Sequence, residues 1–498
     1  MRIIVRHRPG LWAALASGIA LAAAYVSTAA PGITWANHGG DGGDLVAAVV
    51  SSGVPHPSGY PTYLLLGRLF LAWPAGDPAY RLTLMSAATM ALAGGILAAL
   101  AASGSPGVNR KAVVGLVAGL SFGLAPLPWS QAVIAEVHGL NALFAALTLV
   151  LIGCLSSLKR TGWPVTALAV VCGLGLGNHL TFTLMVPPLA ATMWASWRSG
   201  ERRRITMPAV GFGLGLAVYA LLPLLARQHP PVNWGDASTW DGFRWLVSGG
   251  PYRAMVFGLS LSEVPQRMAA WAGLLLDQFG LVGWVLVGVG LALGRSRWPW
   301  VDRAALWMAV AYSAFALGYD AADSSAYLIP AYLGLAWWLA LGLGVVLAWV
   351  DRLRPGSAVF AVGLLVLAGG VRLPAIVQEV DARHDRRALD YSAQVLRQAP
   401  PEALILTSQD YDSFPLWYAQ FGLGQRPDLR LVVVPLGQFD WYRRGLGTTY
   451  PDLELPPRDV GDVWAWEAEL LARNPRPVCR TEVLGEGAGL GVRLSCVP

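Results

Sequence analysis

Long apolar runs separated by short polar segments follow one another from residue 11 to residue 373. A helix that crosses a membrane needs about 20 mainly apolar residues. The pattern predicts eleven such helices, at residues 11–30, 82–103, 112–128, 139–157, 163–179, 180–197, 207–226, 271–294, 304–319, 326–350 and 357–373. We therefore expect a mainly α-helical protein that crosses the membrane many times.

Basic residues are concentrated in the short loops between these apolar runs, where they indicate the cytoplasmic side. Six clusters occur, at Arg2/Arg6/Arg8, Arg110/Lys111, Lys159/Arg160, Arg198/Arg202/Arg203/Arg204, Arg295/Arg297/Arg303 and Arg352/Arg354. With eleven spans, all six clusters face the cytoplasm. A single helix over residues 163–197 would move the later clusters to the other side, so the charges favour a break at Asn178 and His179. The N-terminus is then cytoplasmic, and the expected location is the plasma (inner) membrane of the cell.

The composition agrees with a membrane protein, since 55% of the residues are hydrophobic and only 13% are charged. A soluble domain usually carries about 25% charged residues. The net charge of +6 does not indicate a nucleic-acid partner, because most of the basic residues lie in the loops. The basic segment 1–8 and the apolar run after it also resemble a signal peptide. We favour an uncleaved first helix because many further spans follow.

The chain divides into two predicted domains. Residues 1–373 form the transmembrane domain, with long outward loops at 31–81 and 227–270. Residues 374–498 are more charged and contain no further span, so they are expected to form an extracytoplasmic domain. Within that domain the pattern predicts a helix, a strand, a helix and a strand, at 383–398, 404–407, 414–421 and 429–434. This order is typical of a small α/β domain.

Cys479 and Cys496 end two strand-like runs near the C-terminus. Antiparallel pairing of these runs would place the two cysteines opposite each other, and Val483 opposite Val492. Because the outer compartment permits disulfides, Cys479 and Cys496 are a candidate disulfide.

Polar residues from five separate stretches are predicted to meet at the outer face of the membrane. They are Asp41, Asp44, His56, Glu136, His138, Asn178, His179, Asp320 and Asp323. Charged groups near membrane depth are costly and usually have a function. This convergence is the main functional signal that the residue pattern provides.

Asp41 and Asp44 lie in the glycine-rich segment of residues 39–44. We expect Asp41 to be functional, because flanking glycines let the backbone approach a substrate closely. For Asp44, a simple role as the cap of a helix that begins at Leu45 is an equal alternative.

The other polar candidates also have two readings each. His56 lies between two prolines that fix the backbone, so it either contacts a substrate or closes a tight loop. Glu136 and Asn141 either face the aspartates or simply place polar groups near a helix N-terminus. Asn178 and His179 interrupt a span, and lining a polar cavity would explain both the break and the residue types.

Four motifs hold most of these candidates. They are Asp41-Gly-Gly-Asp44-Leu, Gly53-Val-Pro-His56-Pro-Ser-Gly-Tyr60-Pro, Trp129-Ser-Gln-Ala-Val-Ile-Ala-Glu136-Val-His138-Gly-Leu-Asn141 and Gly173-Leu-Gly-Leu-Gly-Asn178-His179. Together they resemble a bacterial membrane family of formerly unknown function that is similar to protein O-mannosyltransferases of the GT-C superfamily. The chain departs from that family's usual pattern at Asp44, where Glu is usual, at His138, where Tyr is usual, and at Ser58, where Pro is usual.

The resemblance implies a GT-C-like helical bundle and an inverting glycosyltransferase, with Asp41 as the general base. The donor would be a polyprenyl-phosphate sugar carried by the lipid bilayer. The sugar would be mannose, and the acceptor a hydroxyl of a protein Ser or Thr, or of a glycolipid, on the outer face.

The mechanism that the resemblance implies also suggests roles for the other candidate residues. Acceptor or base orientation is expected of Asp44, Glu136, His138, Asn141, His56 and Tyr60. Binding of the donor phosphate is expected of His179, Asn178, Arg81, Arg227 and Arg253. The sequence indicates no particular cofactor, and a divalent metal that bridges carboxylates and phosphate is compatible with the superfamily. A secondary transporter also fits many spans and a broken helix, but the polar residues gather toward one face rather than the midplane.

Overall fold

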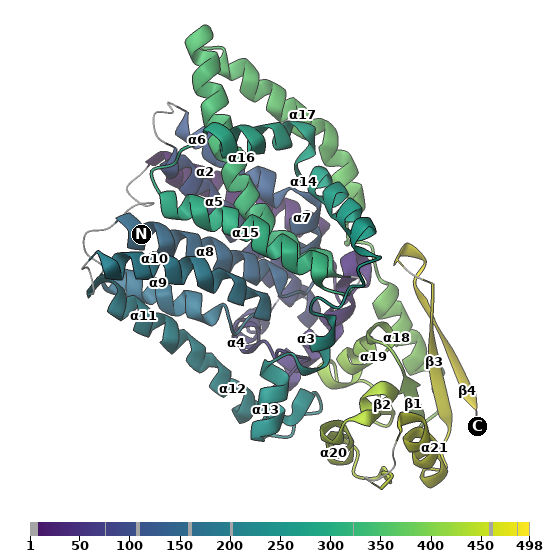
Figure 1. Cartoon of the computed structure of the whole chain (residues 1–498). Coiled ribbons are helices and arrows are strands. Elements are labelled where there is room, and N and C mark those ends of the chain that lie inside the picture. Colours follow the sequence, from purple (N-terminus) through teal and green to yellow (C-terminus); the bar gives the residue numbers. More distant parts are fainter. Residues whose placement is uncertain are drawn as a thin grey trace.

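The computed structural model describes residues 8–74, 76–105, 110–157, 162–199, 203–321, 323–457, 462–485 and 487–497. Figure 1 shows a long helical bundle with a smaller domain of helices and strands attached at one end. Five of the basic residues used to predict orientation, Arg2, Arg6, Lys159, Arg160 and Arg202, lie outside the described residues.

The bundle is built from helices that follow the apolar runs of the sequence. They are α2 (Arg8–Thr28), α5 (Pro78–Gly104), α6 (Lys111–Gly123), α7 (Pro126–Ala132), α8 (His138–Ser157), α9 (Trp163–Leu174), α10 (Val186–Arg198), α11 (Arg203–Gly215), α12 (Leu221–Ala226), α14 (Val264–Leu293), α15 (Pro299–Gly318), α16 (Ile329–Leu353) and α17 (Ala358–Val380). Short 3-10 helices η2 (Leu180–Met185), η3 (Leu216–Ala220) and η6 (Ser324–Leu328) join some of them.

Seven helical segments of the described chain are long and apolar enough to cross a membrane, or eight if the bent pair α6 and α7 forms one span. The protein is therefore a multi-pass membrane protein. Helices α9 and α10, at 12 and 13 residues, are shorter than the usual span. The expected count of eleven spans is thus not confirmed and stays a prediction. The break that the charges predicted is present, because α9 ends at Leu174 and η2 begins only at Leu180.

Small residues let the central helices pack closely. A Cβ atom added at Gly115 of α6 would lie 2.4 Å from the Ala98 carbonyl of α5, and one at Gly119 would lie 2.7 Å from the Gly94 carbonyl. Apolar lipid gives little hydrophobic drive for helix association, so such close backbone contact supplies much of the packing. By contrast, α17 is almost entirely exposed and runs along the edge of the bundle (Figure 1).

The two predicted outward loops form short helices at one end of the bundle. The first loop contains η1 (Ala36–Asp41), α3 (Gly42–Ser51) and α4 (Pro61–Leu71), and the second contains η4 (Trp234–Asp236), α13 (Trp240–Val247) and η5 (Gly250–Met255). The amphipathic helix expected near residues 63–73 corresponds to α4, which buries Tyr63 and Leu64 and exposes Leu65 and Leu69. A single bridge between Val54 and Asn233 joins the two loops.

The C-terminal domain is an α/β unit, as the order of predicted elements indicated. Its elements are α18 (Arg387–Gln398), β1 (Leu404–Thr407), α19 (Asp410–Trp417), η7 (Tyr418–Gly422), β2 (Arg430–Val433), η8 (Val434–Gln438), α20 (Asp440–Thr449), α21 (Val463–Arg473), β3 (Val478–Leu484), η9 (Gly487–Gly489) and β4 (Gly491–Val497). The sheet has the order β2-β1-β3-β4, in which β1 is parallel to both β2 and β3, and β3 is antiparallel to β4.

The β3–β4 hairpin confirms the predicted register. Cys479 lies opposite Cys496, and Val483 lies opposite Val492. The two cysteines form a disulfide. The bond ties the end of β4 to a strand whose other neighbour is the central strand β1.

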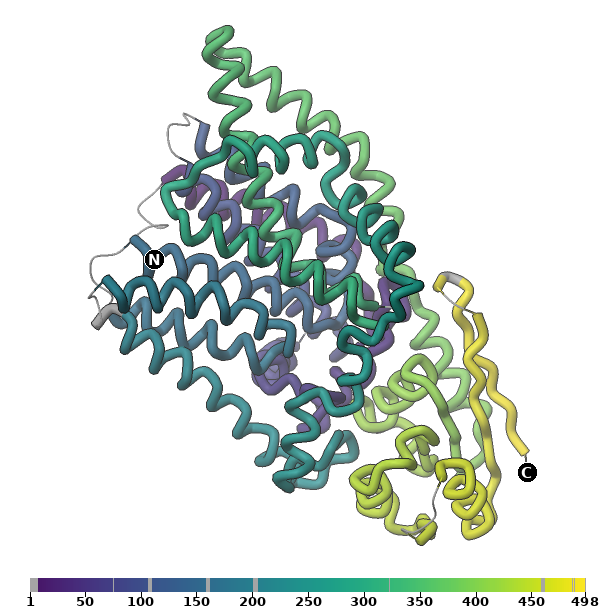
Figure 2. Tube along the Cα trace, viewed as in Figure 1, coloured from purple at the N-terminus to yellow at the C-terminus, as the bar shows by residue number. Residues whose placement is uncertain are grey.

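One hydrophobic core joins the C-terminal domain to the outward loops. Leu45 and Val46 of α3 belong to the same buried cluster as Leu404 of β1 and Phe414 of α19. Figure 2 shows the C-terminal chain, in green to yellow, meeting the purple N-terminal segment at the end of the bundle. The domain boundary at residue 373 stays a prediction. The shared core shows that the outward loops and the C-terminal domain pack against each other.

Candidate active site

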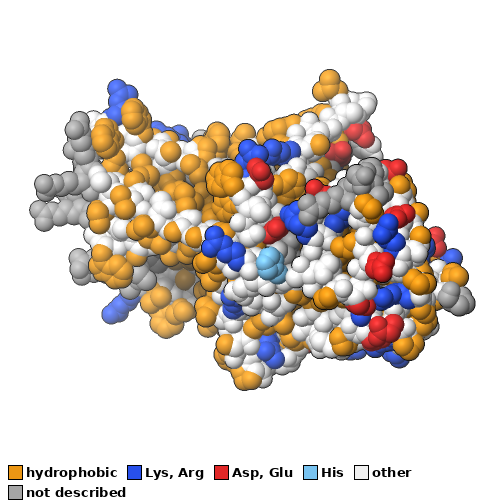
Figure 3. Space-filling view, turned by 90° about the horizontal axis from the view of Figure 1, so that it is seen from below, with side chains coloured by type: hydrophobic (Ala, Val, Ile, Leu, Met, Phe, Trp, Pro, Cys, Tyr) orange, Lys and Arg blue, Asp and Glu red, His pale blue; other side chains and the backbone are white. Residues whose placement is uncertain are grey.

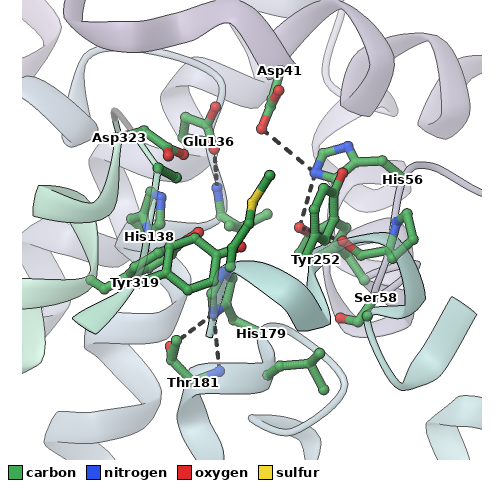
Figure 4. Close-up of a pocket in the computed structure, with 18 of the residues that line it drawn as sticks. Asp41, His56, Ser58, Glu136, His138, His179, Thr181, Tyr252, Tyr319 and Asp323 are labelled. Carbon is green, nitrogen blue, oxygen red and sulfur yellow. Dashed lines mark hydrogen bonds and ion pairs between the residues drawn. The ribbon is translucent and has the colours of Figure 1, made fainter. Parts of the chain in front are cut away.

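A cavity of about 460 Å³ lies where the outward loops meet the C-terminal domain. Eight of the predicted site residues line it: Asp41, His56, Tyr60, Glu136, His138, His179, Arg253 and Asp323. Figure 4 shows the labelled side chains pointing into this space from several separate elements. On the face of the molecule seen in Figure 3, charged side chains gather toward the side of the C-terminal domain.

Asp41 is the last residue of η1 and directly precedes α3. About 36% of its side chain remains exposed, and one carboxylate oxygen lies 3.6 Å from Nε2 of His56. Enclosure by the surrounding protein raises the pKa of Asp41, the charge of His56 opposes this, and Asp323 and Asp44 raise it further. The site therefore contains a carboxylate that is accessible from the cavity and has a raised basicity.

A tight turn holds Asp41 in place from the N-terminal side. Asn37 and His38 both adopt left-handed backbone conformations there. The Asn37 side-chain amide donates a hydrogen bond to the carbonyl of Val380, at the end of α17, over 2.9 Å. The backbone carbonyl of Asn37 accepts a hydrogen bond from the side-chain amide of Gln131.

The C-terminal domain holds the segment just before that turn. One carboxylate oxygen of Asp385 accepts hydrogen bonds from the Thr34 hydroxyl and from the backbone N–H groups of Trp35 and Ala36, at 2.6, 3.2 and 2.7 Å. Burial alone would raise the pKa of Asp385, but hydrogen bonds from Arg387 and Thr34 lower it to about 2. A permanently ionised group of the C-terminal domain thus fixes the start of the loop that carries Asp41.

Asp44 does not reach the cavity. It is fully buried, and it accepts hydrogen bonds from the backbone N–H of His56 at 2.9 Å, from Nδ1 of His56 at 2.7 Å and from Nε1 of Trp234 at 3.0 Å. The capping interpretation was wrong, because α3 begins at Gly42 and the Asp44 side chain bonds to other segments. Direct contact between Asp44 and an acceptor is also excluded by this burial, so its role is to position His56.

His56 lies between the two aspartates. Burial alone would lower its pKa, but the carboxylates of Asp41 and Asp44 outweigh burial and raise the pKa of His56 to about 9. The ring is therefore protonated at neutral pH. Its Nδ1–H donates to Asp44, and its Nε2 lies 2.9 Å from the Tyr60 hydroxyl, which donates in turn to the carbonyl of Pro57 at 3.1 Å. This chain of contacts fixes an imidazolium beside Asp41.

Two of the glycines around Asp41 lie close to the C-terminal domain. A Cβ atom at Gly40 would lie 3.1 Å from the ring of Tyr411, and one at Gly43 would lie 2.4 Å from the backbone oxygen of Phe414. Both neighbours belong to α19. The expectation that these glycines let a substrate approach the backbone was therefore wrong at Gly43, where the C-terminal domain occupies that space, whereas Gly40 still lines the cavity.

A second group of side chains surrounds the cavity opposite the Asp41–His56 pair in Figure 4. Glu136 lies in the connection between α7 and α8, and enclosure and the nearby Asp41 charge raise its pKa. The ring of Tyr327 contacts both His138 and His179, with centroids 5.9 and 5.4 Å apart. Nδ1 of His179 and the hydroxyl of Thr181 form a hydrogen bond of 2.8 Å.

Several predicted residues lie outside the cavity lining. The guanidinium of Arg81 donates to the backbone carbonyls of Leu71 and Gly76, and Arg227 forms the C-terminal cap of α12. Neither lines the cavity, so the prediction that they bind a donor phosphate there was wrong.

Three other predicted site residues, Asn178, Asn141 and Asp320, also lie outside the cavity lining. Asn178 is fully buried and donates to the Val137 carbonyl at 3.1 Å, and Asn141 donates to the Thr181 hydroxyl at 3.4 Å. Asp320 is solvent-exposed, 3.9 Å from Arg267. These three residues support or flank the cavity without lining it.

Tyr252, Asp410 and Tyr411 are among the lining residues that were absent from the predicted site. Tyr252 directly precedes the predicted Arg253 in the chain. Asp410 and Tyr411 belong to α19 of the C-terminal domain, and no local pattern links them to Asp41. Their place in the cavity follows only from the packing of α19 on Gly40 and Gly43.

A metal does not fit the described residues. In the ranges that the structure describes, no three His, Cys, Asp or Glu side chains are arranged so that they could hold a metal ion. The carboxylates of the cavity are distributed around its walls.

Two segments of the chain match known protein families. Residues 41–203 match the protein O-mannosyl-transferase TMEM260 N-terminal domain, and residues 388–450 match TMEM260-associated domain 2. The first segment begins at Asp41, and the second contains Asp410 and Tyr411. Both matched segments thus contribute to the cavity, which is also lined by residues between Ser248 and Tyr327 that lie outside them.

Comparison with curated proteins gives relatives of the same kind. The chain is 26% identical to protein O-mannosyl-transferase TMEM260 of Mus musculus over 466 residues, covering 86% of this chain and 63% of the relative. It is 22% identical to protein O-mannosyl-transferase tmem260 of Dictyostelium discoideum, covering 84% and 57%. The chain therefore spans less than two thirds of the length of these relatives.

Solved structures share the fold over almost the whole chain. ArnT from Cupriavidus metallidurans bound to undecaprenyl phosphate matches with a TM-score of 0.57 and 14% identity, covering 94% of this chain and 92% of ArnT. The apo form of ArnT matches with a TM-score of 0.55 and 15% identity over the same shares. The chain thus resembles the protein O-mannosyl-transferases of the TMEM260 family in sequence, and it shares the fold of ArnT.

Proposed function

We propose that the protein is an inverting glycosyltransferase that transfers a hexose from a polyprenyl-phosphate donor to a hydroxyl acceptor on the outer face of the membrane. The observation that carries this proposal is the pair formed by Asp41, which is open to the cavity, and the buried His56 beside it. Mannose is the sugar indicated by the names of the relatives, and a protein Ser or Thr is the acceptor that those names indicate.

Asp41 acts as the general base in this mechanism. The acceptor oxygen attacks the anomeric carbon of the donor sugar while Asp41 takes the hydroxyl proton, and the bond from that carbon to the phosphate oxygen breaks. The new bond forms on the face opposite the leaving group, so the configuration inverts. The imidazolium of His56 keeps a positive charge near Asp41, which favours the ionised base before the reaction.

The leaving polyprenyl phosphate needs charge stabilisation more than it needs a proton. Arg253 is the arginine among the lining residues, and it donates to the Ser248 hydroxyl, which also lines the cavity. His179 and Thr181 add further polar groups on another part of the wall.

Apolar side chains continue the cavity wall beyond these polar groups. Leu180, Leu184, Val256 and Phe315 are suited to the first isoprene units of a lipid donor. The ArnT structure that shares the fold was solved with undecaprenyl phosphate, which supports this class of donor.

Asp41→Asn tests the proposed role directly. Purified protein is incubated with radiolabelled polyprenyl-phosphate mannose and a membrane extract, and the transfer of label to a larger product is measured. We expect Asp41→Asn to lower transfer by about 10²- to 10⁴-fold, the usual contribution of general base catalysis. Asp320→Asn is the matched control, since Asp320 is an exposed acid at the same end of the bundle, and it should stay within about twofold of wild type.

Two outcomes would overturn the proposal. Equal transfer by Asp41→Asn and wild type would remove Asp41 as the base. No transfer by wild type with lipid-linked sugars, together with uptake of a polar solute that Asp41→Asn abolishes, would favour a transporter instead.

A further inference from the structure

Asp410 enters the cavity from the C-terminal domain as the first residue of α19. It is not needed to cap that helix. The capping box is formed by Gln409 and Asp412, and Asp412 also accepts hydrogen bonds from the Thr481 hydroxyl and from the backbone N–H of Ser408. The Asp410 side chain is exposed, and within the described residues its carboxylate has neither a hydrogen bond nor an ion pair.

The position of Asp410 is fixed by the docking of α19 on the loop that carries Asp41. The Tyr411 ring lies against Gly40, with a T-shaped contact to Trp35 whose centroid lies 6.3 Å away. The backbone of Phe414 lies against Gly43. A helix seated on both sides of Asp41 in this way holds its first residue beside the base.

The two aspartates and Tyr252 line the same cavity, and the electrostatics of this group agree with that placement. After the effect of enclosure, the Asp41 charge contributes most to raising the pKa of Asp410, which reaches about 7. The pKa of Tyr252 is raised by enclosure and then by Asp41 and Asp410, in that order. Asp41, Asp410 and Tyr252 therefore surround a common volume.

This volume does not suit a phosphate. Two neighbouring carboxylates repel an anion, whereas they attract a group that can donate hydrogen bonds. The attacking hydroxyl occupies only the Asp41 carboxylate. The second carboxylate remains available for another N–H or O–H donor on the same molecule.

We propose that Asp410 binds the acceptor, by accepting a hydrogen bond from an uncharged or cationic N–H or O–H group next to the attacking hydroxyl. This inference rests on the proposed glycosyltransferase function and assigns the C-terminal domain a direct part in acceptor selection. Tyr411 and Tyr252 flank the same volume and exclude water from it. An anionic acceptor would be rejected, because it would meet both carboxylates.

The test compares Asp410→Asn, Asp410→Glu and wild type in the transfer assay described above. The probes are the acceptor fraction of the membrane extract and the labelled polyprenyl-phosphate mannose, each titrated separately. We expect Asp410→Asn to raise the apparent KM for the acceptor fraction at least fivefold and to leave the KM for the donor within twofold. Asp410→Glu should recover part of the loss, because it restores the carboxylate.

The pH profile provides a readout that a merely structural role would not move. Asp410 faces the charges of Asp41, His56, Asp44 and Asp412, and its pKa is raised to about 7, so its carboxylate is present above that pH and is lost below it. The apparent KM for the acceptor should therefore rise in wild type as the pH falls through 7, and Asp410→Asn should lose this pH dependence.

The matched control is Asp440→Asn. Asp440 is also the first residue of a helix in the C-terminal domain, α20, and it is exposed away from the cavity. An unchanged acceptor KM in Asp410→Asn would overturn the inference, and so would equal losses in Asp410→Asn and Asp440→Asn. If wild type itself shows no transfer, the proposed function falls and this inference falls with it.

Discussion

Asp41 and Asp410 enter the same cavity from two distant regions of the chain, and they are held in different ways. Asp41, in the wall formed by the outward loops, lies beside an imidazolium that is itself fixed by the buried Asp44. Asp410, in the wall formed by the C-terminal domain, has no bonded partner among the described residues. Only the backbone of its helix is fixed, by the docking on Gly40 and Gly43.

This difference matches the two tasks that a transfer reaction requires. A general base must stay ionised and correctly oriented before the substrate arrives, so its charge network is built in advance. A residue that recognises a substrate must keep its hydrogen-bonding capacity unused until binding. In the proposed mechanism, the wall formed by the outward loops thus holds the prearranged base, Asp41. The wall formed by the C-terminal domain holds Asp410, whose carboxylate is free to bind the acceptor.

Gly43→Ala should have the largest effect, because it separates the two walls. The new Cβ would lie 2.4 Å from the Phe414 oxygen, which belongs to backbone and cannot rotate away. Overpacking of this kind typically costs about 1–3 kcal/mol. We expect transfer to fall by about tenfold or more, with a lower melting temperature measured by thermal unfolding in detergent.

Gly445→Ala is the control for that substitution. Gly445 lies in α20 of the C-terminal domain, and a Cβ there has no neighbour within 4 Å. It should leave transfer and melting temperature close to wild type. A Gly43→Ala protein with wild-type transfer would show that close docking of α19 is unnecessary.

Asp44→Asn should have an intermediate effect that depends on pH. The pKa of His56 is raised to about 9 by Asp41 and Asp44, so its positive charge is present below that pH and is lost above it. Removing the Asp44 charge lowers this pKa, and the imidazolium is then lost at a lower pH. In a pH–rate profile, the alkaline limb of Asp44→Asn should move to lower pH, with transfer reduced about tenfold near pH 8.

The control is Asp241→Asn, because Asp241 lies in α13 with 88% of its side chain exposed. Its profile should overlay that of wild type. If the alkaline limbs of Asp44→Asn and wild type coincide, the charge of His56 does not support the base.

The double substitution Cys479→Ser and Cys496→Ser should have the smallest effect on transfer. The hairpin that it opens lies at the outer edge of the sheet, and neither cysteine lines the cavity. A disulfide closing a loop of this length, with a sequence separation of 17, contributes about 3 kcal/mol. We expect thermal stability to fall while transfer stays within about twofold, and a tenfold loss of transfer would contradict this.

The sequence by itself determined the features that depend on local pattern. Hydropathy located the helices, and the positions of the basic residues located the break before η2. Both signals are local, because each segment that enters lipid must be apolar and must pair its own backbone N–H and C=O groups. The alternation of β3 and β4 was enough to pair Cys479 with Cys496. The polar residues of the outward loops were also visible, since carboxylates and histidines at membrane depth need a reason.

Only the tertiary structure decided which of these residues line the cavity and which support it from outside. The two aspartates of the first motif have similar sequence surroundings, yet Asp41 faces the cavity and Asp44 is fully buried. Arg81 and Arg227 were excluded because neither lines the cavity, and Asp410 was included because α19 docks on two glycines. Such contacts join residues far apart in the chain through side-chain volume and backbone proximity, and no periodicity within a short window records them.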